Sequence, residues 1–225
     1  MRLVIFDCDG TLVDSQHNIT SAMAHAFTAH GLPPPSTHEI LGGVGLSLTE
    51  AFIRLAPQAA PDVRHSLADH YRNAFAGGML SRGTEPLYPG ITEIIEHLRG
   101  QDAMALGIAT GKSKRGVARV LAEQGWQDAF ATIQTADDHP SKPHPSMILT
   151  AMAETGATPA TTIMIGDTTF DIEMALGARA SAIGVSWGYH APSTLHDAGA
   201  HTVVSDARDL AAAIDALLAS PQQRT

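Results

Sequence analysis

This 225-residue chain has a single cysteine, no long apolar run and no excess of basic side chains. The single cysteine, Cys8, excludes an intramolecular disulfide and fits a reducing compartment, so we expect a cytoplasmic protein. No apolar run reaches the roughly 18–20 residues of a membrane span, and two aspartates within the first nine residues are unlike a signal or transit peptide. We therefore expect no membrane partner.

Positive charge and paired histidines are also scarce. With 14 basic against 23 acidic side chains the net charge is −9, which disfavours a nucleic-acid partner, because phosphate backbones bind basic surfaces. No two of the twelve histidines are three or four residues apart, so no helix face offers paired imidazole ligands for a metal. The chain has three lysines, which all lie between residues 112 and 142.

Short apolar runs rich in β-branched residues, typical of strands buried on both faces of a parallel sheet, are spread along the chain. They are Leu3–Phe6, Met104–Ala109, Phe130–Ile133, Thr161–Ile165 and Ala182–Val185. Helical stretches lie between them: Ile91–Arg99, Ser113–Gln124, Ser146–Glu154 and Thr169–Leu176. The alternation from about residue 87 onward predicts an α/β fold, a Rossmann-like doubly wound parallel sheet. A glycine follows each helix and predicts a left-handed end: Gly100, Gly125, Gly156 and Gly177.

Residues 15–86 interrupt this alternation with three or four amphipathic helical stretches and no convincing strand. Ser36-Thr37-His38-Glu39 and Ser47-Leu48-Thr49-Glu50 have the form of helix capping boxes, and Gly77-Gly78 is expected to end the last helix. We therefore predict a discontinuous core domain of residues 1–14 and 87–225. An all-helical cap domain of residues 15–86 is inserted into it.

Polar clusters follow the predicted strands, at the sheet edge where ligands bind in open α/β folds. In Asp7-Cys8-Asp9-Gly10-Thr11, two carboxylates point the same way as the chain leaves a strand, which favours a divalent cation between them. An ordinary turn is the alternative for this cluster alone. An EF-hand loop is excluded because its later ligand positions are not filled.

The second cluster, Thr110-Gly111-Lys112-Ser113, joins a strand to a helix and offers a hydroxyl, backbone N–H groups and a helix N-terminus to an anion. It is not a P-loop, because residue 106, where that motif needs glycine, is leucine. The third is Lys142, held between a serine and a proline, and a plain surface lysine is its alternative. In the fourth, Gly166-Asp167-Thr168-Thr169-Phe170-Asp171, two carboxylates one helical turn apart can face one cation.

Taken together and in this order, the clusters resemble the four motifs of haloacid-dehalogenase-superfamily phosphatases. The similarity is to the subgroup that includes phosphoglycolate phosphatases and β-phosphoglucomutases. Asp7 to Thr11 is similar to the first motif, Thr110 to the second, Lys142 to the third, and Gly166 to Asp171 to the fourth. The helical insertion stands where that subgroup has its cap, so the resemblance covers essentially the whole chain.

The resemblance implies a Mg²⁺-dependent phosphatase that hydrolyses a small, phosphoglycolate-like phosphate monoester. Asp7 would be the nucleophile that forms an aspartyl-phosphate, and Asp9 the acid and base. Thr110 and Lys142 complete the implied catalytic set. Thr110, Gly111, Lys112 and Lys142 would bind the substrate phosphate. The Mg²⁺ ligands would be Asp7, Asp9 through its backbone carbonyl, Asp167 and Asp171.

The sequence argues against some other activities of the same fold and leaves others open. A dehalogenase needs no second aspartate of the first motif, and a cap lysine for Schiff-base chemistry is excluded because residues 15–86 contain no lysine. A sugar-phosphate mutase stays open, as does a non-catalytic protein that binds a phosphorylated ligand. The expected partner is a small phosphorylated metabolite, and the chain is expected to be a monomer or homodimer.

Three features of the sequence have two interpretations each. Cys8, between two aspartates, is a small filler rather than a nucleophile, because negative charge disfavours the thiolate. The stretch Gly42-Gly43-Val44-Gly45 is either a substrate-specificity loop or a flexible connector. Any cap arginine that faces the crevice would select an anionic substrate; the candidates are Arg54, Arg64, Arg72 and Arg82.

Overall fold

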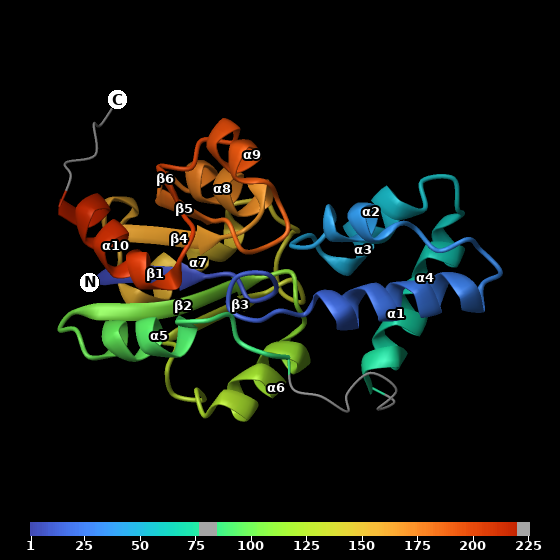
Figure 1. The fold of residues 1–225 in the computed structure, drawn as a ribbon, viewed down its shortest axis with the longest axis horizontal. Coiled ribbons are helices and arrows are strands. Elements are labelled where there is room, and N and C mark those ends of the chain that lie inside the picture. Colours follow the sequence, from blue (N-terminus) through green and yellow to red (C-terminus); the bar gives the residue numbers. More distant parts are fainter. Residues whose placement is uncertain (77–84, 220–225) are drawn as a thin grey trace.

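The computed structural model describes residues 1–76 and 85–219, and its centre is a six-stranded sheet whose paired strands are all parallel (Figure 1). The strand order is β3-β2-β1-β4-β5-β6. The bounds are β1 Arg2–Phe6, β2 Met104–Thr110, β3 Thr132–Thr135, β4 Thr162–Gly166, β5 Ser181–Val185 and β6 Thr202–Val204. The predicted doubly wound parallel sheet is confirmed, since this order reverses beside the first strand.

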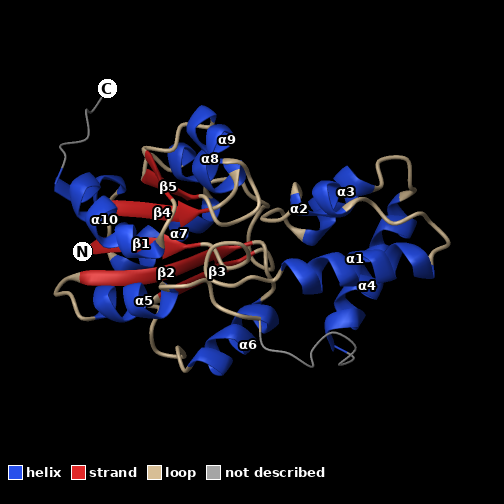
Figure 2. Cartoon of the chain, viewed as in Figure 1, coloured by secondary structure: helices blue, strands red, loops and turns tan. Residues whose placement is uncertain are grey.

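Helices cover both faces of the sheet because alternate residues of each strand point to opposite sides. Val4 and Phe6 of β1 pack in one hydrophobic cluster with α5 (Ile91–Arg99), α6 (Lys114–Gln124) and α10 (Leu210–Ala219). Leu3 and Ile5 pack in the other with α7 (Ser146–Thr155), α8 (Thr169–Gly177) and α9 (Pro192–Asp197) (Figure 2). Two short 3-10 helices, η1 (Pro159–Thr161) and η2 (Ala207–Asp209), precede β4 and α10.

The segment after β1 is helical, as predicted, and forms a separate group to one side of the sheet (Figure 1). Its elements, which we call the cap helices, are α1 (Gln16–Ala29), α2 (Thr37–Leu41), α3 (Leu48–Leu55) and α4 (Pro61–Ala76). They share a hydrophobic cluster in which the rings of Phe27 and Phe52 stack with their centroids 6.1 Å apart. The domain bounds at residues 14/15 and 86/87 remain a proposal.

Two short connections join the cap helices to the sheet and run side by side. The backbone N–H of Asp14 donates to the carbonyl of Pro86 at 2.8 Å, and that of Tyr88 donates to the carbonyl of Leu12 at 3.1 Å. The chain therefore leaves the core for the cap helices and returns to it at the same place. Among the described helices, none has an apolar stretch long enough to cross a membrane.

Helix ends agree with the sequence in part. Ser36 and Glu39 form the predicted capping box, and the side chain of Ser47 accepts a hydrogen bond from the backbone of Glu50. Gly125 and Gly156 are left-handed, with φ of 70° and 69°. The predicted stop at Gly77-Gly78 lies outside the described residues.

The prediction of left-handed ends at Gly100 and Gly177 is wrong. Gly100 has φ of −77°, and Gly177 is still helical, with Ala178 as the C-cap. After α8 the backbone N–H of Ala178 still donates to the carbonyls of Met174 and Ala175, so the helical turn continues past the glycine. After these two helices the residues with positive φ are instead Ala103 and Arg179, at 56° and 58°. The sequence patterns also did not predict β6, α9 or α10.

Candidate active site

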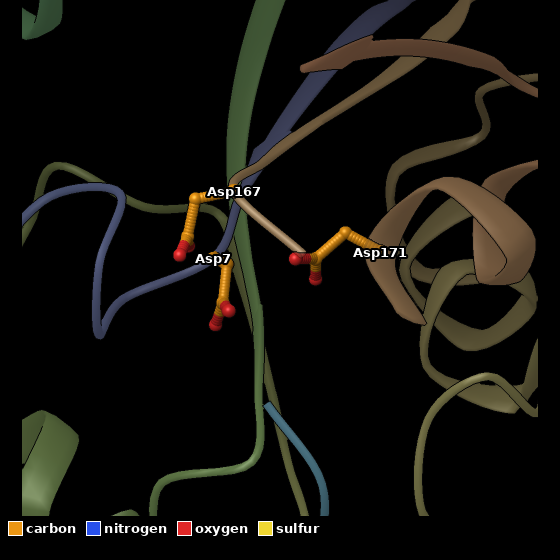
Figure 3. Close-up of side chains that lie close together, drawn as sticks. All are labelled: Asp7, Asp167 and Asp171. Carbon is orange, nitrogen blue, oxygen red and sulfur yellow. The ribbon is translucent and has the colours of Figure 1, made fainter. Parts of the chain in front are cut away.

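Three buried carboxylates meet at the carboxyl ends of β1 and β4, which are neighbours in the sheet (Figure 3). Asp7 follows β1, Asp167 follows β4, and Asp171 lies in the first turn of α8. One oxygen of each lies within 4.8 Å of the others. Two of the polar clusters that stand 160 residues apart in sequence are thus brought to one point, because Phe6 of β1 pairs with Ile165 of β4.

Asp167 is held from both sides. The hydroxyl of Thr11 donates to its Oδ1 at 2.8 Å, and the backbone N–H of Tyr189 donates to its Oδ2 at 2.9 Å. Glycine is needed beside it, because a Cβ on Gly10 or Gly188 would overlap the Asp167 side chain. Gly10 also has φ of +85°, which side chains with a Cβ rarely adopt. Gly10 and Gly188 therefore leave room for the Asp167 carboxylate.

Lys142 joins Asp7 to Asp171 and is 1% exposed. Its Nζ lies 2.6 Å from Asp171 Oδ1 and 3.0 Å from Asp7 Oδ1. Asp171 Oδ2 accepts hydrogen bonds from the backbone and hydroxyl of Thr168, at 3.1 and 2.7 Å. The alternative of a plain surface lysine is therefore wrong: the side chain is buried, and the carboxylates of Asp7 and Asp171 compensate the burial of its charge.

Asp7 presents two different oxygens. Its Oδ1 accepts from the backbone N–H of Cys8 at 2.6 Å and contacts Lys142. Its Oδ2 is buried and has no hydrogen-bond partner among the described residues. A buried acceptor without a partner is uncommon in native proteins and points to a ligand or a chemical role.

The charges at this point do not balance, since three carboxylates face one ammonium. Burial raises the pKa of Asp7 to about 7, with Lys142 lowering it and Asp171 raising it again. Burial and the charges of Asp171 and Asp7 hold the pKa of Asp167 well above its usual range. Burial opposes the charge of Lys142, but Asp171 and Asp7 raise its pKa above the ordinary value. The surplus of negative charge suits a hard divalent cation, which prefers oxygen ligands.

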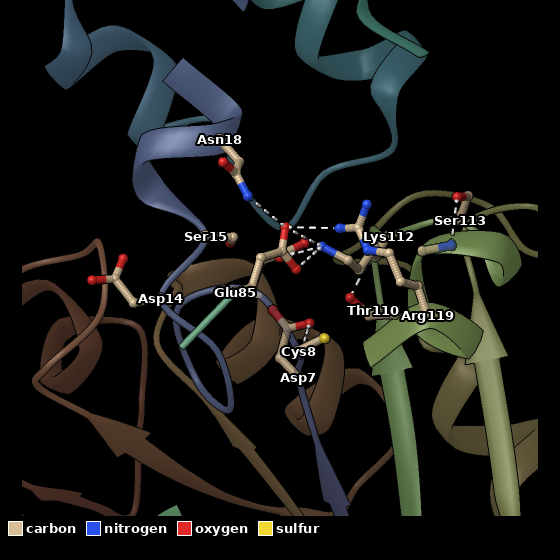
Figure 4. A network of polar contacts seen from close by, with 12 residues as sticks. Asp7, Cys8, Asp14, Ser15, Asn18, Glu85, Thr110, Lys112, Ser113 and Arg119 are labelled. Atoms are coloured by element: carbon tan, nitrogen blue, oxygen red, sulfur yellow. Dashed lines mark hydrogen bonds and ion pairs between the residues drawn. The ribbon is translucent and has the colours of Figure 1, made fainter. Parts of the chain in front are cut away.

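Asp9 belongs to a second group of charges, which includes Lys112 and Glu85. Figure 4 labels Lys112 and Glu85 in this network. The Nζ of Lys112 lies 2.7 Å from Asp9 Oδ1 and 3.1 Å from Glu85 Oε2. Arg119 pairs with Glu85 Oε1 at 3.1 Å, and Asn18 of α1 approaches the same oxygen at 3.5 Å. Lys112, predicted to bind substrate, thus already stands between two carboxylates.

Sequence reasoning missed Glu85 altogether. Its side chain is 1% exposed and bridges the end of the cap segment to α6 of the core. A lone glutamate before Pro86 carries no pattern that separates it from a surface residue. Only the return of the chain to the sheet buries it, so no signal in the sequence finds it.

A cavity of about 690 Å³ lies between the core and the cap helices, with Asp7 and Asp9 in its lining. Thr110, Gly111 and Lys112 line it from the core side. The other predicted site residues are not in that lining: they are Lys142, Asp167 and Asp171. The structure therefore separates the predicted residues into a set that faces the cavity and a buried set that supports Asp7.

The stretch from Gly42 to Gly45 approaches the core closely. Gly43, Val44 and Gly45 line the cavity, and the backbone N–H of Ser47 donates to the hydroxyl of Ser141 in the core at 2.7 Å. These contacts favour a loop that faces the substrate over a loose connector. Of the cap arginines, Arg72 lines the cavity and Arg82 lies outside the described residues.

Gly111 is expected to be sensitive to the smallest substitution. A Cβ there would lie 2.5 Å from the carbonyl oxygen of Leu46 and 2.7 Å from that of Gly45, so the loop would have to move. Because small misplacements at a reacting site are costly, we expect Gly111→Ala to lower kcat/KM at least about tenfold. At Gly100 the nearest atom would be 3.5 Å away, so Gly100→Ala is the matched control. Equal kcat/KM for the two variants would contradict the prediction.

Cys8 packs as a filler, as predicted. It is fully buried in the hydrophobic cluster of β1 and α6. Burial, followed by the charge of Asp9, raises the pKa of its thiol well above the usual value. The raised pKa favours the protonated thiol. The contribution of Cys8 to the site is its backbone N–H, which donates to Asp7 Oδ1.

Comparison with known proteins agrees with this geometry. Residues 4–185 match the family described as haloacid dehalogenase-like hydrolase. The chain is 37% identical over 219 residues to "Probable phosphatase IndB" of Dickeya dadantii, covering 96% of this chain and 94% of that protein. It is 28% identical over 217 residues to a phosphoglycolate phosphatase of Pseudomonas putida, covering 93% and 78%. A predicted phosphatase from Clostridium acetobutylicum has a crystal structure with a TM-score of 0.84 and 25% identity, covering 96% and 98%.

The chain therefore belongs to the haloacid dehalogenase-like hydrolase family, which the four motifs predicted. It is an enzyme of the hydrolase class, and the relatives named above are phosphatases by description. The carboxylates at the ends of β1 and β4 are its candidate catalytic centre.

Proposed function

We propose that this chain is a Mg²⁺-dependent phosphatase that hydrolyses a small phosphate monoester through an aspartyl-phosphate on Asp7. The observation that carries the proposal is the state of Asp7. Its carboxylate lines the cavity, one oxygen is fixed by Cys8 and Lys142, and the other has no hydrogen-bond partner among the described residues. A fixed carboxylate with one free oxygen is suited to nucleophilic attack.

In the proposed reaction, Asp7 Oδ2 forms a bond to phosphorus while the bond from phosphorus to the alcohol oxygen breaks. Asp9, in the lining of the same cavity, gives its proton to the departing alcohol. Asp9 then takes a proton from a water molecule, which attacks the aspartyl-phosphate and releases phosphate. Lys142 keeps Asp7 oriented throughout, because it holds Oδ1.

The substrate phosphate would lie against the strand end that carries Thr110 and Gly111. The backbone N–H of Lys112 donates a hydrogen bond to Thr110 Oγ1 at 3.2 Å. This bond holds the hydroxyl just before the start of α6. Thr110, Gly111, Lys112 and Lys142 are the residues proposed to bind the phosphoryl oxygens. Fixed donors aimed at developing negative charge are the usual source of stabilisation in phosphoryl transfer.

The donor set fits a divalent cation. The carboxylates of Asp7, Asp167 and Asp171 each have an oxygen within 4.8 Å of the others, and the backbone carbonyl of Asp9 is proposed as a further ligand. These residues would hold Mg²⁺. When bound, the ion offsets the surplus carboxylate charge and draws in the substrate phosphate.

Phosphate release from p-nitrophenyl phosphate tests the proposal. With Mg²⁺ we expect turnover, and with EDTA we expect a loss of at least about 100-fold that Mg²⁺ restores, because a divalent ion contributes several kcal/mol of charge stabilisation. Mg²⁺ should also raise the melting temperature, since it binds only the folded carboxylate group. Unchanged turnover in EDTA would contradict the proposed Mg²⁺ dependence. If no phosphate were released under any condition, the result would favour the non-catalytic alternative. A mutase would transfer phosphate between sugar positions rather than release it.

A further inference from the structure

The cavity is larger than a phosphate and a small acid require. Its volume is about 690 Å³, within the range of roughly 300–1,000 Å³ in which proteins bury drug-sized ligands. Asp7 and Asp9 line the same space, so the volume beyond the phosphate is where the leaving alcohol lies. Glycolate, among the smallest alcohols, would leave most of that volume unfilled.

The cap helices give the cavity an apolar wall. The wall residues come from α1, α2, α3 and α4 and are Ile19, Met23, Ile40, Leu48, Tyr71 and Phe75. Apolar surface of this kind favours the burial of apolar groups and not of a carboxylate.

The wall is preformed, because its aromatic side chains pack together. The rings of Tyr71 and Phe75 have centroids 5.2 Å apart, and those of Tyr71 and Phe52 are 6.3 Å apart with their planes at 82°. Phe52 is fully buried in the cluster of the cap helices. Aromatic pairs of this geometry stabilise one another, and the guanidinium carbon of Arg119 lies over the ring of Phe75, 5.7 Å from its centroid.

The cations around the cavity are mostly already paired. Arg72 forms an ion pair with Asp69 on its own helix at 2.8 Å, Arg119 pairs with Glu85, and Lys112 pairs with Asp9. Arg115 also lines the cavity, but its side chain is exposed. Among the described cap residues, the wall thus offers no unpaired buried cation to a substrate carboxylate.

We propose that this enzyme prefers phosphate monoesters whose alcohol carries a ring or another bulky apolar group, and that phosphoglycolate is a poor substrate. Phe75 and its neighbours determine this specificity by contact with the apolar part of the alcohol. The inference rests on the proposed phosphatase function and narrows its substrate class.

Three esters of primary alcohols separate size from chemical reactivity: ethyl phosphate, phosphoglycolate and 2-phenylethyl phosphate. We expect kcat/KM for 2-phenylethyl phosphate to exceed that for ethyl phosphate at least about tenfold, since a buried methylene alone is worth about that factor. It should also exceed kcat/KM for phosphoglycolate, whose carboxylate gains nothing from the wall. The measurement is phosphate release with Mg²⁺ present.

Variants of the wall test whether contact is the cause. Phe75→Ala should lower the ratio of kcat/KM for 2-phenylethyl phosphate to that for ethyl phosphate by about tenfold, and Phe75→Leu should keep most of the ratio. Ile53→Ala is the matched control, because Ile53 lies on α3 with 42% exposure and is absent from the cavity lining. It should leave the ratio unchanged.

The inference is overturned if phosphoglycolate has the highest kcat/KM of the three, or if Phe75→Ala and Ile53→Ala give the same ratio. Failure of the proposed function looks different. In that case neither these esters nor p-nitrophenyl phosphate release phosphate, and no comparison between them arises.

Discussion

Phosphate release is expected to fall at least about 10⁴-fold in Asp7→Asn, because an amide replaces the attacking carboxylate and loss of a nucleophile has effects of this size. The fold should survive the change. Asparagine has the same shape, and its carbonyl can still accept from the backbone N–H of Cys8. The variant also removes one of three buried carboxylates that share one lysine, so we expect no loss in the free energy of unfolding.

The control for this variant is Asp215→Asn, the same chemical change at an exposed position of α10. It should leave kcat/KM unchanged. Labelled phosphate should become attached to the wild-type chain during turnover and not to Asp7→Asn. An active Asp7→Asn, or label on that variant, would show that another group attacks phosphorus.

The parts of the fold that could be predicted are those with a clear pattern of apolar residues in the sequence. The strands β1, β2, β4 and β5 contain continuous apolar runs, which are typical of a sheet covered on both faces. β6 has three residues, too few for a pattern. The left-handed residues Ala103 and Arg179 are set by how each loop returns to the next strand, and propensity alone favours glycine there.

The candidate site also has a part that the sequence predicts and a part that it does not. Asp7, Asp167 and Asp171 could be found because each follows the end of a strand, and parallel strands carry their ends to one edge. The pairing of Lys112 with Asp9 and Glu85 could not, because it depends on the path by which the cap segment re-enters the core. For the same reason the sequence did not indicate an apolar cap wall.

Lys142→Met is expected to have the largest effect on stability. Among the described residues, Lys142 is the cation that contacts Asp7 and Asp171, and methionine keeps its length but not its charge. Breaking a buried pair by removing one partner typically destabilises by about 3–5 kcal/mol, and we expect a loss of that size near pH 8 without Mg²⁺. Urea unfolding measures it. Lys114→Met, at an exposed pair with Asp138, should cost less than about 1 kcal/mol.

The pH dependence of that loss tests its electrostatic origin. The pKa of Asp7 is already raised to about 7, and removal of Lys142, which lowers it, raises it further. A group whose pKa is raised by folding contributes stability at low pH and loses it as the pH rises through the folded-state pKa. The deficit of Lys142→Met should therefore grow between about pH 5 and pH 8, and Mg²⁺ should reduce it by offsetting the uncompensated carboxylates. A deficit that is equal at both pH values would mean that Lys142 acts through packing alone.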